Sequence, residues 1–281
     1  MSNSLLEYYR KPQIYCSLPS LGKFYFDGIK LSLDGQLAVK AMTANDELML
    51  KNPEALLNGE AILNLLRSCC PDITNPLEVP IIDLDVILIG IRHATYGEDL
   101  EFTSNCPECK EKNTLDINIT NFLDIVEYIE TTPICDINED LKCYIRPFSY
   151  IDSQKLEIAE FEYQSMLRNL NNSDLEKELK EKELQIKEKR DVYISKQLEM
   201  IINCVYRIVT PKDEITDRKQ INEFILQLDK LNYNKINKVI EKINRNTVKK
   251  KFDLKCPMPN CGAEFSQEVD FNNTNFFEKG S

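Results

Sequence analysis

The sequence predicts an α+β fold built from two separate cysteine-bearing β-hairpins, a small N-terminal α/β region and a mainly helical insertion. Two cysteine pairs predict the hairpins: Cys106 with Cys109, and Cys256 with Cys261, with 146 residues between the pairs. Polar and apolar residues alternate beside each pair, and alternation with period two is typical of half-buried strands. Between the pairs the apolar residues recur mainly at helical spacing, which indicates a largely helical insertion.

The spacing of these cysteines is that of a structural zinc site. C-x₂-C and C-x₄-C both lie within the range that zinc sites use, and the proline and glycine residues around each pair favour tight turns. Four thiolates at about 2.3 Å from one ion form a closed tetrahedron. We therefore expect a split zinc ribbon with four cysteine ligands, in which Cys106, Cys109, Cys256 and Cys261 hold one structural Zn²⁺. Because no position is left for water, we expect no zinc-based catalysis; the alternative is two separate clusters of buried free thiols.

The other six cysteines are expected to act as small buried hydrophobes. Cys69 and Cys70 would point in different directions on a helix, whereas Cys135 and Cys143 flank a turn and could face each other across a hairpin. Residues 1–10 are polar and aromatic and do not resemble a secretory signal, so we expect a reducing compartment and no disulfides. The remaining two are Cys16 and Cys204.

Composition and charge restrict the classes of partner. The chain has 281 residues, 42% of them apolar, and a net charge of −11, which argues against a nucleic-acid-binding surface. A basic run, Lys249–Lys251 with Lys255, precedes the second cysteine pair, and we expect it to be a solvated strand face. The longest apolar stretch, 79–91, is interrupted by Asp83 and Asp85 and is shorter than the roughly 18 residues of a membrane span. We therefore expect a soluble protein with no membrane insertion.

Local signals divide the chain into five regions. They are an N-terminal β and turn segment (1–40), a small helical region (41–97), the first cysteine hairpin (98–125), a mainly helical insertion (126–246), and the second cysteine hairpin with the C-terminal tail (247–281). In the helical region Thr43 is predicted to cap a short helix and Asn58 a second one. A third helix is predicted from about Asp83 to a glycine stop at Gly97.

The insertion is predicted to begin with a β-hairpin over 130–148 and a helix that ends near Leu170. Ser173 and Glu176 would form a capping box for the next helix, whose residues 174–191 alternate acids and bases at i,i+4 spacing. We expect this exposed charged helix to project from the body. Its heptad line of Leu179, Ile186, Tyr193 and Met200 is too narrow for a convincing coiled coil, although pairing with a partner helix is an alternative. An apolar helical face continues through Val205 and Ile208, and two shorter helices follow, at 217–228 and 233–243.

Signatures of catalysis are missing from the sequence. The single histidine, His93, lies on the predicted apolar helix, and no nucleophile or orienting carboxylate stands at recognisable spacing from it. Neither a G-x-G-x-x-G fingerprint nor a Walker-type loop is present, so nucleotide binding has no support.

The order of these features resembles the T-even-type tailed-phage baseplate hub subunit and hub assembly protein family. The resemblance covers most of the chain and is strongest in 11–125 and 215–278. The matching motifs are LPS-x-G-x-x-Y at Leu18–Tyr25, DE at Asp46-Glu47, NG at Asn58-Gly59, R-x-x-x-Y-G at Arg92–Gly97, the two cysteine pairs, and the double phenylalanine Phe276-Phe277.

This resemblance implies a non-enzymatic structural or assembly protein of the contractile-tail baseplate hub, with other phage baseplate and tail proteins as partners. Its location would be the host cytoplasm during assembly, or the baseplate of the virion; the oligomeric state stays open. The candidate contact surfaces are Leu18–Tyr25 and the tail with Phe276 and Phe277, unless these phenylalanines fold back onto the protein itself. The alternative function is a zinc-ribbon nucleic-acid-binding or transcription-associated viral protein.

Overall fold

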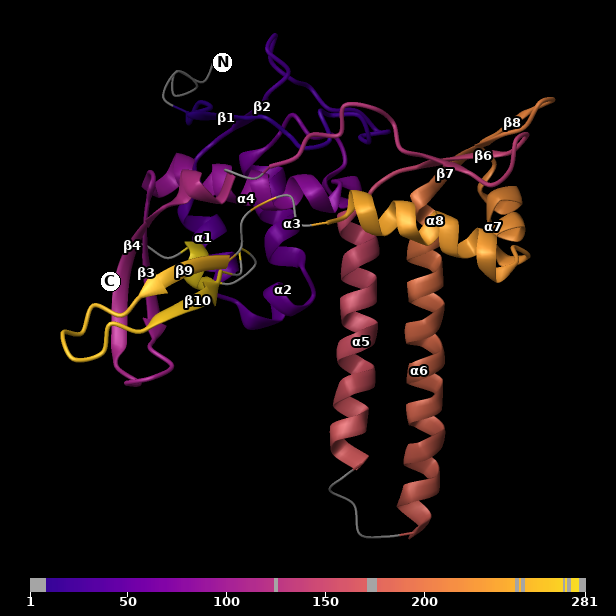
Figure 1. Ribbon diagram of the computed structural model, residues 1–281. Helices are drawn as coiled ribbons and strands as arrows, with labels where there is room; N and C mark the ends of the chain where they lie inside the picture. Colours follow the sequence, from indigo (N-terminus) through magenta and orange to yellow (C-terminus); the bar gives the residue numbers. More distant parts are fainter. Residues whose placement is uncertain are drawn as a thin grey trace, which may run out of the picture. The chain divides into compact units, whose positions relative to one another are not determined.

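The computed structural model describes residues 9–123, 126–170, 176–245, 248, 251–269, 271 and 274–277. The chain forms two compact units (Figure 1). Unit 1 combines Met1–Pro76, Ile82–Tyr128 and Asn246–Ser281, and unit 2 combines Leu77–Ile81 with Ile129–Arg245. The chain mixes helices with small antiparallel sheets, so the α+β class predicted from the sequence is confirmed.

Unit 1 contains three two-stranded antiparallel sheets and a group of helices. The strand pairs are β1 (Ile14–Cys16) with β2 (Leu37–Val39), β3 (Asp99–Asn105) with β4 (Lys112–Asn118), and β9 (Lys251–Lys255) with β10 (Glu264–Glu268). The α-helices are α1 (Ala44–Leu50), α2 (Pro53–Leu57), α3 (Glu60–Cys69) and α4 (Ile81–Tyr96), and short 3-10 helices lie at η3 (Ile119–Leu123) and η4 (Thr274–Phe277). A further 3-10 helix, η2 (Pro76–Glu78), spans the boundary between the two units in the sequence.

The first residues of the helices were predicted from the sequence with mixed success. The predicted cap at Thr43 is confirmed, because its side chain accepts the Asp46 N–H while the Asp46 carboxylate accepts the Thr43 N–H. The expectation for Asn58 is wrong in detail. The N-cap of α3 is Gly59, at φ 71°, and Asn58 accepts the N–H of Glu60 instead. Helix α2, which Asn52 caps ahead of Pro53, was not predicted from the sequence.

Helix α4 is the centre of unit 1. Eleven of its sixteen residues are buried, and they lie on every side of the helix. A helix that is apolar all round must be covered all round. Gly90 allows β1 to approach, since a Cβ there would lie 2.3 Å from Cys16 Sγ. The helix stops as predicted at Gly97, which has φ 85° and donates its N–H to the His93 carbonyl.

One end of α4 holds the N-terminal segment through Asp83. This carboxylate is fully buried and accepts hydrogen bonds from the Ser20 N–H (2.8 Å), the Ser20 hydroxyl and the Tyr25 hydroxyl (2.9 Å). Leu18, Ser20 and Phe24 are buried, whereas Leu21 (41% exposed) and Lys23 are exposed. The segment Leu18–Tyr25 therefore serves mainly the interior of unit 1, and the structure corrects its interpretation as a contact surface.

The other end of α4 holds the C-terminal segment through Arg92. Its side chain is 1% exposed, its Nε donates to the Phe276 carbonyl at 2.8 Å, and its guanidinium lies 5.6 Å from the centre of the Tyr96 ring. The rings of Phe122, Phe271, Phe276 and Phe277 pack edge to face beside it. Phe276 and Phe277 are 3% and 1% exposed. They fold back into the core, so the expectation of an aromatic docking tail is wrong and its alternative holds.

Unit 2 is a four-stranded antiparallel sheet with helices. The strand order is β5-β6-β7-β8, with β5 (Ile134–Asp136), β6 (Lys142–Ile145), β7 (Val205–Val209) and β8 (Glu214–Ile215). Its helices are α5 (Tyr150–Leu170), α6 (Glu176–Cys204), α7 (Arg218–Leu226) and α8 (Lys230–Ile243). The predicted hairpin forms from β5 and β6 and places Cys135 opposite Cys143, both buried free thiols.

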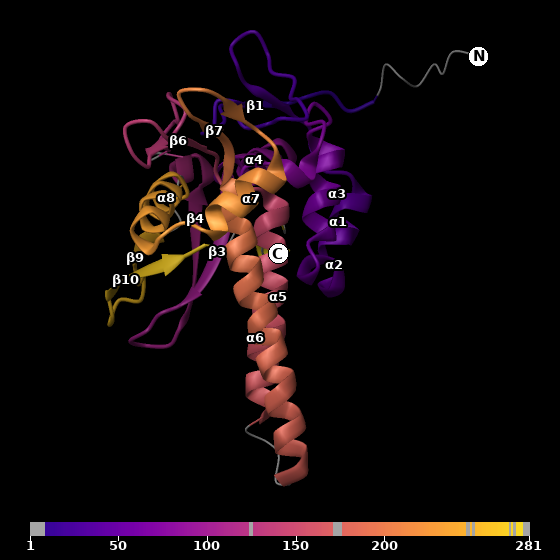
Figure 2. The ribbon, with the colours of Figure 1, turned by 90° about the vertical axis from the view of Figure 1, so that its right-hand side faces the viewer.

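The long helices α5 and α6 run side by side (Figures 1 and 2). The Tyr163 and Tyr193 rings stack at 6.1 Å, and Lys189 pairs with Glu162 at 2.6 Å. Tyr193 of the predicted heptad line therefore contacts α5 of the same chain, and Lys189 beside it adds an ion pair between the two helices. The predicted break at 171–173 and the cap at Ser173 lie outside the described residues.

The helix predicted to continue through Val205 and Ile208 instead ends at Cys204, and β7 begins at Val205. The run Val-Tyr-Arg-Ile-Val favours a strand by its β-branched and aromatic residues, and β6 supplies the pairing edge. The next two helices are capped by Asp217 and Asp229, which moves the start of α8 three residues ahead of the predicted one. No described helix is both long and apolar enough to cross a lipid bilayer.

We expect a pH-dependent contribution of Asp83 to stability. Burial raises its pKa from 3.8 to about 6, against the hydrogen bonds from Ser20 and Tyr25 that lower it. Between these two pH values the folded protein therefore keeps the proton on Asp83, whereas the unfolded chain has lost it. The resulting stability is full below a pH of about 4, is lost as the pH rises through about 6, and amounts to about 3 kcal/mol.

The measurement is urea unfolding of the wild type and Asp83→Asn at several pH values. The free energy of unfolding of the wild type, minus that of the variant, should fall as the pH rises across this window. Asp34→Asn at an exposed turn is the control and should give a flat difference. A flat difference for Asp83→Asn as well would contradict the buried titration.

We also expect the double variant Phe276→Ser, Phe277→Ser to lose about 4 kcal/mol or more in the free energy of unfolding, because truncating one buried phenylalanine costs about 3–5 kcal/mol. Calorimetry would measure it. Phe26→Ser with Phe161→Ser, at 55% and 58% exposure, is the matched control and should change stability by less than about 1 kcal/mol. An unchanged melting temperature in the Phe276→Ser, Phe277→Ser variant would contradict the core role of these rings and support a role in binding a partner.

Candidate metal centre

The two cysteine pairs lie at the turns of two hairpins in unit 1. The last paired residues of β3 and β4 are Asn105 and Lys112, and Cys106 follows Asn105 directly. The last paired residues of β9 and β10 are Lys255 and Glu264, and Cys256 follows Lys255 directly. The first cysteine of each pair therefore occupies the same place at the end of a strand.

The two turns have equivalent backbone hydrogen bonds. The N–H of Cys106 donates to the Glu111 carbonyl at 3.0 Å, and the N–H of Cys256 donates to the Ala263 carbonyl at 2.8 Å. In each turn the acceptor lies two residues after the second cysteine. The residue directly after that cysteine has a positive φ in both turns, 62° at Lys110 and 59° at Gly262. The longer second turn therefore reproduces the geometry of the first with two additional residues between its cysteines.

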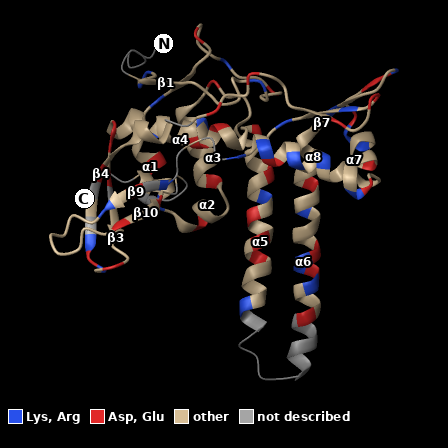
Figure 3. Cartoon of the chain, in the orientation of Figure 1, with Lys and Arg blue, Asp and Glu red and all other residues tan. Residues whose placement is uncertain are grey.

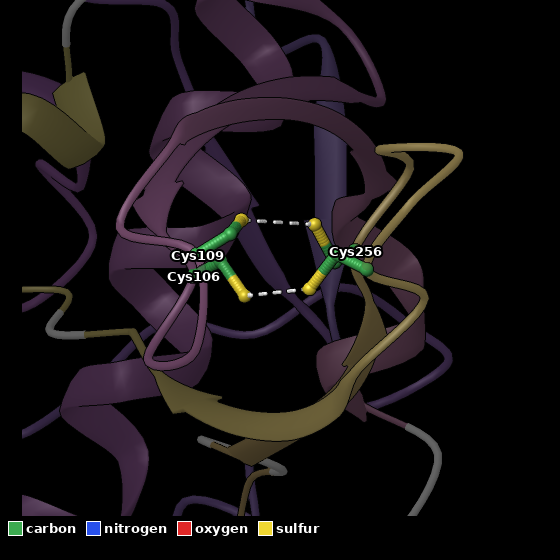
Figure 4. Close-up of side chains that lie close together, drawn as sticks. Cys106, Cys109 and Cys256 are labelled. Atoms are coloured by element: carbon green, nitrogen blue, oxygen red, sulfur yellow. Dashed lines mark hydrogen bonds between the residues drawn. The ribbon is translucent and has the colours of Figure 1, made fainter.

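These turns bring all four sulfur atoms together. The Sγ atoms of Cys106, Cys109, Cys256 and Cys261 all lie within 4.8 Å of one another. Cys106 Sγ is 3.7 Å from Cys261 Sγ, and Cys109 Sγ is 3.8 Å from Cys256 Sγ (Figure 4). A tetrahedron with metal–sulfur bonds of about 2.3 Å has edges of about 3.8 Å. The four thiols thus form one cluster, not two, and its dimensions fit a tetrahedral metal ion.

Backbone N–H groups of the turns point at the sulfur atoms. Those of Cys109 and Glu108 donate to Cys106 Sγ and lower the pKa of Cys106 to about 7. The N–H of Glu111 lowers the pKa of Cys109, but desolvation and the neighbouring thiols outweigh it and raise that pKa to about 12. Hydrogen bonds of this kind favour thiolate over thiol. Four thiolates this close would repel one another strongly, so a cation is the chemical partner that this donor set suits.

The site lies partly inside unit 1. Cys106 and Cys256 are 0% and 3% exposed, Cys261 is half-buried, and Cys109 is exposed. Beside the cluster, the Ser104 hydroxyl of β3 donates to Gln267 Oε1 of β10 at 3.0 Å. The two hairpins are therefore joined by a hydrogen bond as well as by the sulfur cluster.

The structure also places the residues that were not predicted as ligands. The six other cysteines are all buried, as expected of small hydrophobes. Burial raises the pKa of Cys16 to about 12 and is the main cause that raises that of Cys69 to about 11, so both remain thiols. Within the described residues no second group of three or more potential ligands occurs. The structural roles of Asp83 and Arg92 were not predicted from the sequence. For Asp83 the available signal was a charged residue inside an apolar run.

Comparison with known protein families defines the class of the molecule as a bacteriophage structural protein of the tail baseplate. The family described as T4 bacteriophage base plate protein matches residues 12–278, nearly the whole chain, and the chain belongs to that family. No match was found among curated proteins or among solved structures.

We expect elemental analysis of protein purified without added metal to find about one zinc per chain. Because one ion would join both hairpins, Cys256→Ser should raise hydrogen exchange about tenfold or more in 99–118 as well as in 251–268.

The matched control is Cys135→Ser, a buried cysteine of unit 2, which should leave both the zinc content and the exchange of these hairpins unchanged. Zinc content near zero, or faster exchange confined to 251–268, would show that the four cysteines do not share an ion.

Proposed function

We propose that this baseplate protein acts at the central hub, as a non-enzymatic structural or assembly subunit that binds other phage tail proteins. The observation that carries the proposal is membership of the base plate family over residues 12–278. The hub in particular is supported by the motif order, from the Leu18–Tyr25 segment through Arg92–Gly97 to Phe276-Phe277, which resembles hub proteins. Such a subunit would be found in the host cytoplasm during assembly or in the tail baseplate.

We further propose that Cys106, Cys109, Cys256 and Cys261 hold a structural Zn²⁺. The support is the single cluster of sulfur atoms at tetrahedral spacing. The ion supplies four bonds that join two segments distant in sequence, so metal-binding free energy becomes folding free energy. Closing a loop of 146 residues costs an entropy that grows only slowly with length. The hairpins would then provide a rigid scaffold for protein contacts.

The buried or pocket-lining residues that could take part in catalysis support a non-enzymatic role. The arrangement closest to a catalytic one is a groove of about 410 Å³ beside β1 and α4, which Cys16 and His93 both line. Burial raises the pKa of Cys16 to about 12, which leaves it a poor nucleophile. The imidazole of His93 lies 3.7 Å from Glu98. Asp83 and Arg92, the buried charged residues of α4, hold segments of unit 1 in place.

The alternative function, a zinc-ribbon protein that binds nucleic acid, depends on the basic run Lys249–Lys251 near the second hairpin. Lys249 and Lys250 lie outside the described residues, and the net charge of −11 opposes binding to a phosphate backbone. The proposal of a protein-binding hub subunit is therefore favoured.

The test is to remove the gene for this chain from its phage and to examine baseplate intermediates by electron microscopy. We expect intermediates without a complete hub. Supplying the wild-type chain should restore complete baseplates, and Cys106→Ser should restore less than about one tenth as many, since loss of a structural zinc site typically unfolds a domain.

Cys135→Ser is again the control and should restore assembly like the wild type. Complete hubs with defects confined to the periphery, or normal baseplates, would rule out the hub assignment.

A further inference from the structure

Positive charge is concentrated in one part of this acidic chain. Residues 230–255 contain nine Lys and Arg residues but only two acids, a net charge of +7. The remaining residues therefore carry −18. Figure 3 shows Lys and Arg recurring along α8, whereas α5 and α6 carry both signs.

The cations of α8 from Lys235 onward lie on one face, together with Arg245 just after the helix. Lys235, Lys238, Lys242 and Arg245, here named the basic stripe, follow one another at spacings of three, four and three residues, and all four are exposed. Arg245 comes directly after Asn244, the C-cap of the helix. Residues three and four apart are neighbours on a helix surface. The buried residues Ile236 and Ile240 lie on the opposite face, against the core of unit 2.

The basic stripe has little compensation within the protein. Among the described residues none of its four members takes part in an ion pair; Lys235 donates to the Ile137 carbonyl at 2.8 Å. The nearby acid on the helix, Glu241, accepts a hydrogen bond from Asn237 at 2.6 Å. Lys238, Lys242 and Arg245 thus direct their charges at solvent.

This arrangement costs the helix stability. Each like-charge pair at three- or four-residue spacing destabilises a helix by about 0.2–0.5 kcal/mol. The helix dipole favours cations in the last turn, which accounts for Lys242 but not for Lys235 or Lys238. Elsewhere in unit 2, charged residues of the long helices α5 and α6 form ion pairs, for example Lys189 with Glu162. A partner that supplies negative charge would offset the repulsion on α8.

We propose that the basic stripe of α8 is a docking surface for a carboxylate-rich segment of another protein. Charge complementarity is the argument: four cations in line over about 15 Å match an acidic helix or strand of similar length. Leu231 lies one helical turn before Lys235 and is 77% exposed, which provides an apolar anchor at the end of the stripe. Nucleic acid is disfavoured, because a duplex extends past the stripe and meets the net negative charge of the other residues of unit 2.

The proposal goes beyond the hub assignment and depends on neither it nor the metal, because every residue of the stripe lies in unit 2. The variant to test is Lys238→Glu with Lys242→Glu and Arg245→Glu; Lys235 is left in place because it bonds to Ile137. The matched control, Lys187→Glu with Lys212→Glu and Lys219→Glu, changes three exposed lysines of the same unit and alters the net charge equally.

Binding would be measured by fluorescence anisotropy with a labelled oligoglutamate peptide and, separately, a short DNA duplex. We expect the full-length wild type to bind the peptide, with affinity falling about tenfold or more as salt rises from about 50 to 300 mM. The stripe variant should lose about tenfold or more at low salt, and the control should stay within about threefold, since only the stripe residues contact the peptide.

Circular dichroism would confirm that both triple variants keep the wild-type fold. Three outcomes would overturn the proposal: no peptide binding at low salt, equal losses in the stripe variant and the control, or tighter binding of the DNA duplex than of the peptide.

Discussion

The burial of α4 on every side is the constraint on which unit 1 depends. A helix with apolar residues on every side is stable in water only if other segments cover its whole circumference. Its two buried charged residues hold two of those segments: Asp83 accepts hydrogen bonds from Ser20 and Tyr25, and Arg92 donates to the carbonyl of Phe276. Unit 1 is therefore assembled around one helix from stretches that are far apart in the sequence.

This arrangement gives the short sequence motifs a physical meaning. The Leu18–Tyr25 segment packs against one part of α4, while Arg92 and the phenylalanine pair meet at another. The buried residues of these motifs thus serve the folding of unit 1 and are not available for binding. Contact surfaces are better sought where charge is left uncompensated, as on α8.

The C-terminal stretch is attached to unit 1 in two ways. Phe276 and Phe277 place their rings in the core, and Cys256 with Cys261 completes a cluster that begins at Cys106. The first attachment is hydrophobic, whereas the second is a cluster of four sulfur atoms at the spacing of a tetrahedral metal site. Together they join the parts of unit 1 that precede and follow the helical insertion in the sequence.

The sequence by itself determined what depends on neighbours along the chain. Cysteine spacing identified the four clustered thiols, and Thr43 with Asp46 identified a helix start, because the interacting atoms are a few residues apart. Tertiary structure alone decided that β7 is a strand, that Asp83 and Arg92 hold distant segments, and that Phe276 points inward. Each of these depends on a partner far away in sequence, and periodicity carries no information about such partners: the same apolar spacing suits a helix face or a strand until a neighbouring edge is present.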